Sequence, residues 1–230
     1  MHRIFRRLAL VLGILLAATV LTVGMYRFVP VPITPLMVIR LVEQWIEARP
    51  VRMAKRWTTL ENISPHLLAA VMAAEDQHFL EHYGIDVDAI EQALERNKRL
   101  KKLYGASTIT QQVAKNVFLW PQRSWARKLF EFYFSLFLEL LWSKRRILEV
   151  YVNVIEWGDG VYGAYQASHV YFHHPPDQLS KEEAALLAAV LPNPRRWRPD
   201  DPTDYILKRQ AWILKYMPQM RLQLDRLERG

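Results

Sequence analysis

The chain has 230 residues, of which 51% are hydrophobic and 23% charged, and it contains no cysteine. These figures exclude a collagen-like chain, a disordered tail, a disulfide scaffold and any site built from thiolates. The formal net charge of +8 suits a nucleic acid, a membrane surface or an anionic substrate, and composition alone does not choose among them.

The N-terminal segment carries only positive charges. Its basic residues before the first acidic residue, Glu43, are Arg3, Arg6, Arg7, Arg27 and Arg40. The uncharged run from Leu8 to Met25 would measure roughly 27 Å as a helix, close to the hydrocarbon thickness of a bilayer. A cleaved signal peptide is the alternative, but its apolar region is normally shorter and ends at an Ala-x-Ala-like site, which is not evident here.

We therefore predict that residues 1–27 form a cytoplasmic N-terminus and a transmembrane anchor. The arginines before the span hold the N-terminus inside, which places the chain from Val29 onward on the outer face. Residues 28–59 are predicted to be a proline-rich linker and a membrane-proximal helix, with the helix over Leu36 to Ala48. Residues 60–230 show no linker or repeat and are predicted to be one mainly α-helical domain.

Helix boundaries are marked at several places in this domain. Ser64 followed by Pro65 is typical of a helix start, and Ser180 with Glu183 forms a capping-box pattern. Apolar residues between Ile147 and Ile155 recur at helical spacing. The same pattern places Glu149, Asn153 and Glu156 on the other face, with Gly158 suited to the helix end.

The segment from Glu75 to Gly84 concentrates ionisable groups directly after an alanine-rich helix. A partly desolvated carboxylate there would have a raised pKa suited to general-base catalysis, whereas the plain alternative is a solvated helix end. The run from His78 to His82 also matches H-x-x-E-H, a pattern in which two histidines one turn apart hold zinc. A five-residue pattern in which two positions are free is matched easily by chance, so this match alone is weak support for a zinc site.

The segment from Gly105 to Asn116 predicts a helix start, because Thr108 and Gln111 fit a capping box. Free backbone N–H groups at such a start favour phosphate, and a solvated helix end is the alternative. Thr108, Gln112 and Lys115 then share one face. No Gly-Lys-Ser/Thr follows the single glycine, which excludes a nucleotide P-loop.

The stretch from Trp125 to Trp142 is apolar nearly all round, which predicts a buried or membrane-contacting helix. Its polar side chains share one arc that includes Arg127, Lys128 and Glu131. A carboxylate inside such a helix needs a partner, either an internal ion pair or a bound ligand or metal.

The sequence contains two basic clusters, Arg96–Lys102 and Arg195–Arg198. Each is expected either to be solvated protein surface or to contact the anionic head groups of lipids. Nucleic acid is not expected as a partner, because the anchor places the domain outside the cell and no binding motif is present.

Five segments together resemble the motifs of the peptidoglycan glycosyltransferases, glycosyltransferase family 51. Residues 75–84 match E-D-x-x-F-x-x-H-x-G, residues 105–116 match the second motif (GASTITQQVAKN), and Arg127-Lys128-x-x-Glu131 matches the third. Ile147-Leu148-Glu149-x-Tyr151-x-Asn153 matches the fourth, and the fifth begins at Gly163 and continues to EAALLAAVLPNP. The blocks occur in order over about residues 60 to 199. No Ser-x-x-Lys of a transpeptidase occurs, so we expect a monofunctional member.

The resemblance implies a lysozyme-like, mainly α-helical fold that polymerises lipid II into β-1,4 glycan strands. It implies an inverting transfer with release of undecaprenyl pyrophosphate. By position, Glu75 is the general base and Glu131 the second catalytic carboxylate. The resemblance assigns substrate binding to Asp76, Phe79, His82, Ser107, Thr108, Gln112, Lys115, Asn116, Arg127 and Lys128. Of these, Asp76, Phe79 and His82 are expected to shape the site rather than to perform chemistry.

The resemblance also implies partners and a location. These are lipid II, the growing glycan chain, the membrane and other cell-wall synthases, at the outer (periplasmic) face of the cytoplasmic membrane. No tightly bound cofactor or resident metal is expected, and Mg or Mn at the pyrophosphate is an open alternative. His173-His174 stands where the family usually has a small residue followed by lysine, which puts fine structure in doubt rather than activity.

Overall fold

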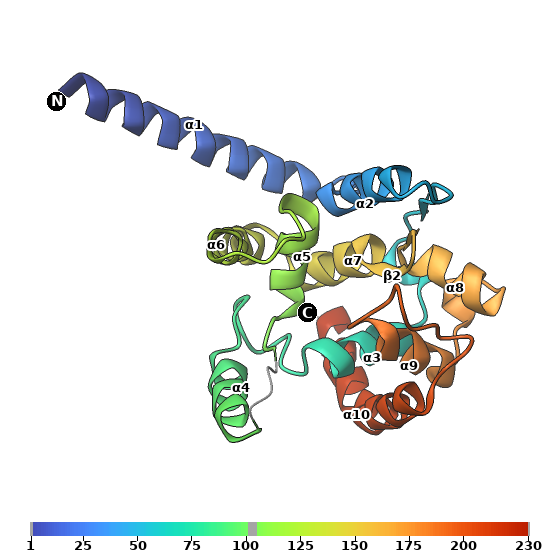
Figure 1. Cartoon of the computed structure of the whole chain (residues 1–230). Helices are drawn as coiled ribbons and strands as arrows, with labels where there is room; N and C mark the ends of the chain where they lie inside the picture. Colours follow the sequence, from blue (N-terminus) through green and yellow to red (C-terminus); the bar gives the residue numbers. More distant parts are fainter. Residues whose placement is uncertain (1, 101–104, 230) are drawn as a thin grey trace.

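The computed structural model describes residues 2–100 and 105–229 and is mainly α-helical, as predicted (Figure 1). In the described residues the α-helices are α1 (His2–Tyr26), α2 (Pro35–Ile46), α3 (Pro65–Glu75), α4 (Val87–Leu100), α5 (Ile109–Phe118), α6 (Trp125–Leu141), α7 (Lys144–Val154), α8 (Ala164–Phe172), α9 (Lys181–Val190) and α10 (Asp204–Arg229). The 3₁₀ turns are η1 (Leu60–Asn62) and η2 (Pro176–Gln178).

A small sheet accompanies the helices. Its strands are β1 (Ala54–Lys55), β2 (Glu156–Gly158) and β3 (Val161–Tyr162). Their order is β1-β3-β2, with β1 parallel to β3 and β2 antiparallel to β3. The sheet joins the segment before α3 to the end of α7, which are far apart in the sequence.

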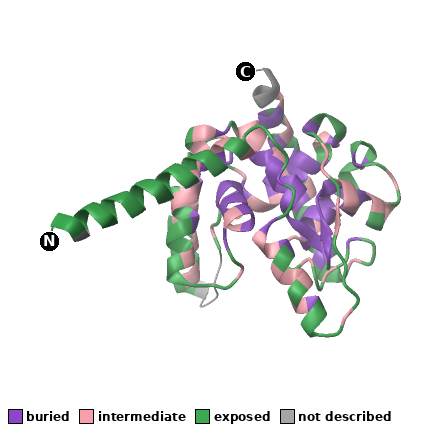
Figure 2. Cartoon of the chain, turned by 90° about the horizontal axis from the view of Figure 1, so that it is seen from above, coloured by how far each residue is buried: buried purple, intermediate pink, exposed green. Residues whose placement is uncertain are grey.

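Two groups of helices build the globular part. In one group α10 packs against α3 and α9, and in the other α5 packs against α6 and α7. Alanines make close packing in the first group possible, because α3 and α9 bury small side chains such as Ala70, Ala73 and Ala188. Figure 2 shows the buried residues gathered in this globular part, whereas α1 is exposed along most of its length.

The predicted helix starts are confirmed. The Ser64 hydroxyl accepts a hydrogen bond from the His66 N–H, and Pro65 occupies the first helical position of α3. Capping boxes are present at Thr108 and at Ser180, before α5 and α9. Each box satisfies backbone N–H groups that a helix leaves without a partner at its first turn.

The prediction for the polar face of α7 was wrong. The helix ends at Val154, so Glu156 and Gly158 belong to β2 instead. Asn153 is fully buried, and its side chain bonds to the backbone of Thr58, accepting from the N–H at 2.9 Å and donating to the carbonyl at 2.8 Å. The Asn153 side chain therefore pairs with the backbone N–H and C=O of Thr58 as a neighbouring strand would. Helical spacing in the sequence does not reveal this role.

Helix α1 projects from the domain and is fixed at its C-terminal end. Among the described helices it is the one long and apolar enough to cross a membrane, over Phe5–Tyr26. The Trp142 indole donates to the Val23 carbonyl at 2.8 Å, and the Arg146 guanidinium donates to the Tyr26 carbonyl at 2.8 and 3.1 Å. The Val23 carbonyl also accepts from the Arg27 N–H, so the indole is a second donor to it, and together these side-chain donors join the end of α1 to the domain.

Gly163 provides a test of the fold. Its φ is +83°, and a β-carbon there would lie 3.0 Å from the Asn153 carbonyl oxygen. We expect Gly163→Ala to lower the free energy of unfolding by about 1–3 kcal/mol, through backbone strain and crowding. Gly105→Ala is the control, because a β-carbon at Gly105 meets nothing within 4 Å. Equal thermal unfolding of the two variants would contradict this expectation.

Candidate functional site

Two cavities adjoin each other at the start of the second motif. The first has a volume of about 690 Å³ and lies beside α5 and α6, and the second has about 570 Å³ and lies between α3, α4 and α10. Gly105 and Ser107 line both cavities, so the start of the second motif separates them. The first cavity is basic, and its cationic lining residues are Arg40, Lys115, Arg123, Arg127 and Lys128.

Glu75, the last residue of α3, lines the second cavity with both carboxylate oxygens held. The Gln112 amide donates to Oε2 at 2.9 Å, and an Arg209 Nη2 lies 3.3 Å from Oε1. The side chain retains 16% of its surface exposed. Burial raises the pKa of Glu75, while Gln112 and the positive charges of Arg209 and Lys115 oppose that rise. A fixed carboxylate with a raised pKa is suited to accept a proton.

Tyr151 holds the Gln112 side chain that contacts Glu75. Its hydroxyl donates to the Gln112 Oε1 at 3.2 Å, which fixes the amide so that its N–H group points at Glu75. Burial raises the pKa of the Tyr151 phenol, with the nearby carboxylate of Glu75 acting in the same direction. The hydroxyl therefore stays protonated and remains a donor at neutral pH.

Asp76 connects the first and second motifs. Its carboxylate accepts from the Ile109 N–H at 2.9 Å, at the start of α5, and lies 3.0 Å from the His82 Nε2. Phe79 is fully buried, with the Lys144 ammonium 4.7 Å from its ring centroid. Phe79 and His82 are not among the described residues that line the two cavities. The contacts of Asp76, Phe79 and His82 thus hold the loop that follows Glu75.

The H-x-x-E-H pattern does not bring its two histidines together. His78 is exposed and lies 3.2 Å from the Glu81 carboxylate, whereas His82 turns inward to Asp76. In the described part of the chain, the group of histidines and carboxylates close enough to share a metal ion is Asp76, His82 and Asp86, which omits His78. The segment forms turns rather than the helix that the zinc pattern requires.

The second motif contributes to both cavities. The Thr108 hydroxyl donates to the Gly84 carbonyl at 2.7 Å and accepts from the Gln111 N–H, so it completes the helix cap. Gln112 and Lys115 line the first cavity, as does the buried Asn116. Thr108 lines the second cavity, and Ser107 lines both. The predicted common face of Thr108, Gln112 and Lys115 is therefore divided between two cavities.

Glu131 is buried on α6, with 3% of its side chain exposed, and it is paired with cations, which is the first of the two alternatives expected for it. The Arg127 Nη1 lies 2.7 Å from one carboxylate oxygen, and the Lys128 Nζ lies 2.5 Å from the other. All three residues line the first cavity. The polar arc of α6 faces the domain interior, where Ser135 is also buried. Burial lowers the pKa of nearby Lys115, and Glu131 opposes this effect.

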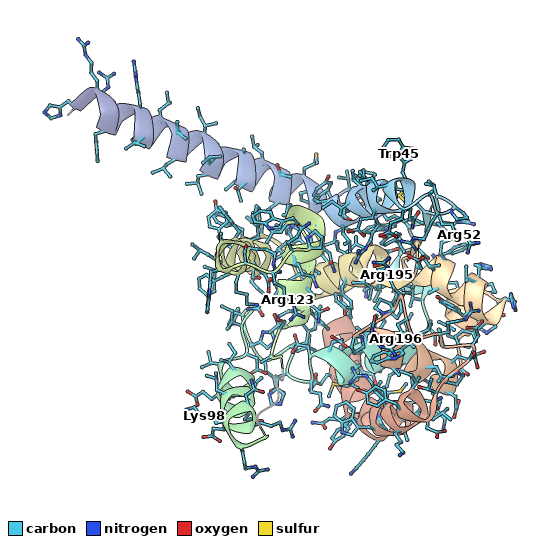
Figure 3. All side chains as sticks on the ribbon, viewed as in Figure 1. Trp45, Arg52, Lys98, Arg123, Arg195 and Arg196 are labelled. Carbon is cyan, nitrogen blue, oxygen red and sulfur yellow. The ribbon has the colours of Figure 1, made fainter. Side chains whose placement is uncertain are left out.

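Sequence reasoning missed three arginines of the site, Arg40, Arg123 and Arg209. Arg40 lies on α2 and lines the first cavity, although the sequence singled it out only as one of the N-terminal positive charges. Arg123 precedes the Ser124 helix cap and lines the first cavity near α5 (Figure 3). Its position between Pro121 and the third motif was the available signal. Arg209 lies on α10, far from every motif in the sequence, and no local pattern distinguishes it from neighbouring basic residues such as Lys208.

The basic clusters fall mostly outside the site. In the cluster at residues 96–102, Arg96 lines the second cavity, Lys98 is exposed on α4, and Lys101 and Lys102 lie outside the described residues. Arg195 is paired with Glu43 and Asp159. Arg198 is paired with Asp200 at 2.6 Å. Arg195 and Arg198 therefore interact with surface carboxylates.

The contribution of the ion pairs of Glu131 to stability can be tested by mutation. Glu131→Gln would leave the half-buried Arg127 guanidinium without its carboxylate, and we expect a loss of about 3 kcal/mol in the free energy of unfolding. Glu182→Gln is the control, since Glu182 is exposed and its Lys181 contact is worth about 0–1 kcal/mol. Denaturant unfolding measures both, and a Glu131→Gln loss as small as the control's would show that the pairs contribute little.

Known proteins are similar to this chain over most of its length. The sequence model of the family described as Transglycosylase matches residues 43–218. A protein named biosynthetic peptidoglycan transglycosylase from Rhodospirillum centenum is 51% identical over 220 residues, covering 95% of this chain and 93% of its own. Proteins of the same name from Bdellovibrio bacteriovorus and Pseudomonas aeruginosa are 55% identical over 190 residues (83% and 76% covered) and 47% identical over 220 residues (96% and 95% covered). The chain therefore belongs to the transglycosylase family and is a peptidoglycan transglycosylase.

Proposed function

We propose that this transglycosylase polymerises lipid II into β-1,4 glycan strands by an inverting displacement that releases undecaprenyl pyrophosphate. The observation that carries the proposal is the position of Glu75. It is a carboxylate held by two donors, and it lies at one of two adjoining cavities, the other of which is lined by cations. An inverting transfer needs this combination of a base for the incoming hydroxyl and positive charge for the leaving group.

Glu75 serves as the general base. The acceptor's GlcNAc 4-hydroxyl attacks the anomeric carbon of the MurNAc unit at the end of the growing chain, and Glu75 takes the hydroxyl proton as the new bond forms. Gln112 and Arg209 keep the carboxylate in one orientation. Its raised pKa brings its basicity closer to that of a base working near neutral pH.

The basic cavity receives the leaving pyrophosphate. Lys115, Arg123, Arg127 and Lys128 line it and offset the negative charge that grows as the glycosidic bond to phosphate breaks. Glu131 acts through its two cations, because it holds Arg127 and Lys128 at the cavity before substrate arrives. The roles of Ser107 and Asn116 are to shape the same cavity.

These residues do not fit a resident divalent cation. Both Glu131 oxygens already accept from cations, and the other lining residues near them are basic. Divalent cations favour several oxygen ligands, which the described lining does not offer at this point. A Mg or Mn ion at the pyrophosphate would therefore arrive with the substrate phosphates, and no step of this mechanism depends on it.

The enzyme works at a membrane surface in this proposal. Helix α1 is the single-pass anchor, with its N-terminus in the cytoplasm and the domain on the outer, periplasmic face. Beside it α6 exposes an apolar face suited to lipid contact. The exposed apolar residues of α6 are Trp125, Leu129, Phe130, Phe132, Leu136 and Leu140. Lipid II and the growing strand share that membrane, and other cell-wall synthases are the proposed protein partners.

The base assignment is tested with Glu75→Gln. Glutamine keeps the size of the side chain but cannot accept the proton, so we expect the polymerisation rate on labelled lipid II to fall by roughly 10²–10⁴-fold. Unfolding measurements should show a folded variant. Glu81→Gln is the control, because Glu81 is an exposed carboxylate of the same segment. Wild-type polymerisation by Glu75→Gln would remove Glu75 from this role.

The effect of Arg209 is tested by the pH dependence of the rate. Glu75 must be deprotonated to act, so activity falls as the pH drops through its pKa. The Arg209 charge lowers that pKa, and we expect Arg209→Met to raise it and to move the acid limb of the pH–rate profile to higher pH. Lys208→Gln, at an exposed neighbouring position on α10, should leave the limb in place. A lower rate with an unshifted limb would show that Arg209 is only structural.

A further inference from the structure

Helix α2 has its apolar face turned outward. Spaced at 100° per residue, its exposed apolar residues fall within an arc of roughly 100°. They are Val38, Val42, Trp45 and Ile46, and the last two are 74% and 71% exposed. The opposite face buries Met37 and the polar Gln44. A helix that faces water has the reverse arrangement, so this face is built for a neighbour other than water.

The polar residues on the inner face of α2 contact the domain. The Gln44 side chain accepts from the Arg52 N–H at 2.7 Å, and Arg40 lies 3.6 Å from the buried Glu156 carboxylate. Leu36 and Arg40 line the first cavity. These contacts prevent α2 from turning over to bury its apolar face within the chain.

The junction with α1 fixes where the outward face of α2 lies. Arg146 and Trp142 hold the end of α1. The Lys55 ammonium donates to the Pro32 carbonyl at 2.9 Å, in the connector between the two helices. That connector spans about eight residues and reaches at most roughly 27 Å, so α2 begins close to the point where the chain leaves α1. Figure 1 shows α1 leaving the domain where α2 begins, with α6 nearby, and Figure 3 shows Trp45 pointing away from the domain.

The residues around this face are typical of the bilayer interface. Trp45 supplies an amphipathic ring of the type that is enriched at the head-group level. Arg27 and Arg52, exposed at either end of the segment, place cations where lipid phosphates would lie. We propose that the face formed by Val38, Val42, Trp45 and Ile46 lies in the head-group and acyl boundary of the membrane, as a contact additional to α1 and α6. This proposal rests on α1 being the anchor.

This contact has a direct consequence for the substrate cavity. One face of α2 rests on the lipid, and the other face supplies Leu36 and Arg40 to the wall of the first cavity. The helix thereby sets the height of the cationic cavity above the bilayer. A pyrophosphate attached to a membrane-embedded lipid can reach the cavity only within a narrow range of heights.

The absence of cysteine makes a direct test possible, because each introduced cysteine is unique. Full-length Val42→Cys and Trp45→Cys would be spin-labelled and reconstituted in vesicles of equal parts phosphatidylethanolamine and phosphatidylglycerol. Glu47→Cys, exposed at the end of α2 away from the apolar arc, is the matched control. Ala17→Cys in α1 reports on the anchor itself. Accessibility to oxygen, which partitions into lipid, is compared with accessibility to a water-soluble nickel chelate.

We expect the labels at positions 42 and 45 to be accessible to oxygen and protected from the nickel chelate, with the opposite result at position 47. Labels at 42 and 45 that match position 47 would overturn the proposal. Labels shielded from both probes would also overturn it, because they would indicate contact with a second copy of the chain. An aqueous label at Ala17 would instead reject the anchor, so the two failures are distinguishable.

Activity provides a second readout. The variant Val38→Ser/Val42→Ser/Ile46→Ser should polymerise lipid II normally in detergent but lose activity several-fold in vesicles. The control is Leu207→Ser/Leu222→Ser, which removes exposed apolar side chains from α10. An equal loss in detergent and in vesicles would show that the α2 side chains act on the fold rather than on the membrane, and would overturn the proposal.

Discussion

The burial of one carboxylate, Glu75, determines how the domain is built around it. A carboxylate removed from water is stable only if its oxygens find donors, and no donor lies on α3 itself. Gln112 comes from α5 and Arg209 from α10, so both groups of helices must meet at the end of α3. Tyr151 on α7 then fixes the Gln112 amide. The contacts around Glu75 thus join four helices, α3, α5, α7 and α10, at the site.

The second carboxylate, Glu131, differs from Glu75 in the balance between its burial and the positive charge around it. It is more deeply buried than Glu75, yet two cations neutralise it, and the surrounding cavity retains positive charge in Lys115 and Arg123. The two acids differ because of their neighbours: Glu75 has limited compensation and a raised pKa, and Glu131 sits within a basic cluster. In the proposed mechanism, these different surroundings give the same type of side chain two different tasks, one with protons and one with phosphate.

Much of the fold could be predicted because its signals are local. Ser64, Thr108 and Ser180 cap helices with side chains three or fewer residues away from their partners, so the sequence carries the whole interaction. The pairing of Glu131 with Arg127 and Lys128 is likewise contained in one helix. Arg209 could not be predicted, because its contact with Glu75 spans most of the chain. The buried face of Asn153 was predicted wrongly for the same reason, since its partner is the backbone of Thr58.

The joint at the base of α1 limits how the protein can be shortened. Trp142 and Arg146 use the carbonyls of Val23, Tyr26 and Val29 as their acceptors. A chain cut after Met25 to improve solubility would leave the Trp142 indole without its acceptor, at a site where its ring is almost fully buried. Each lost acceptor of this kind costs about 1–3 kcal/mol. The globular enzyme therefore begins inside α1, the helix proposed as its anchor, and a stable soluble form must retain the last turn of α1.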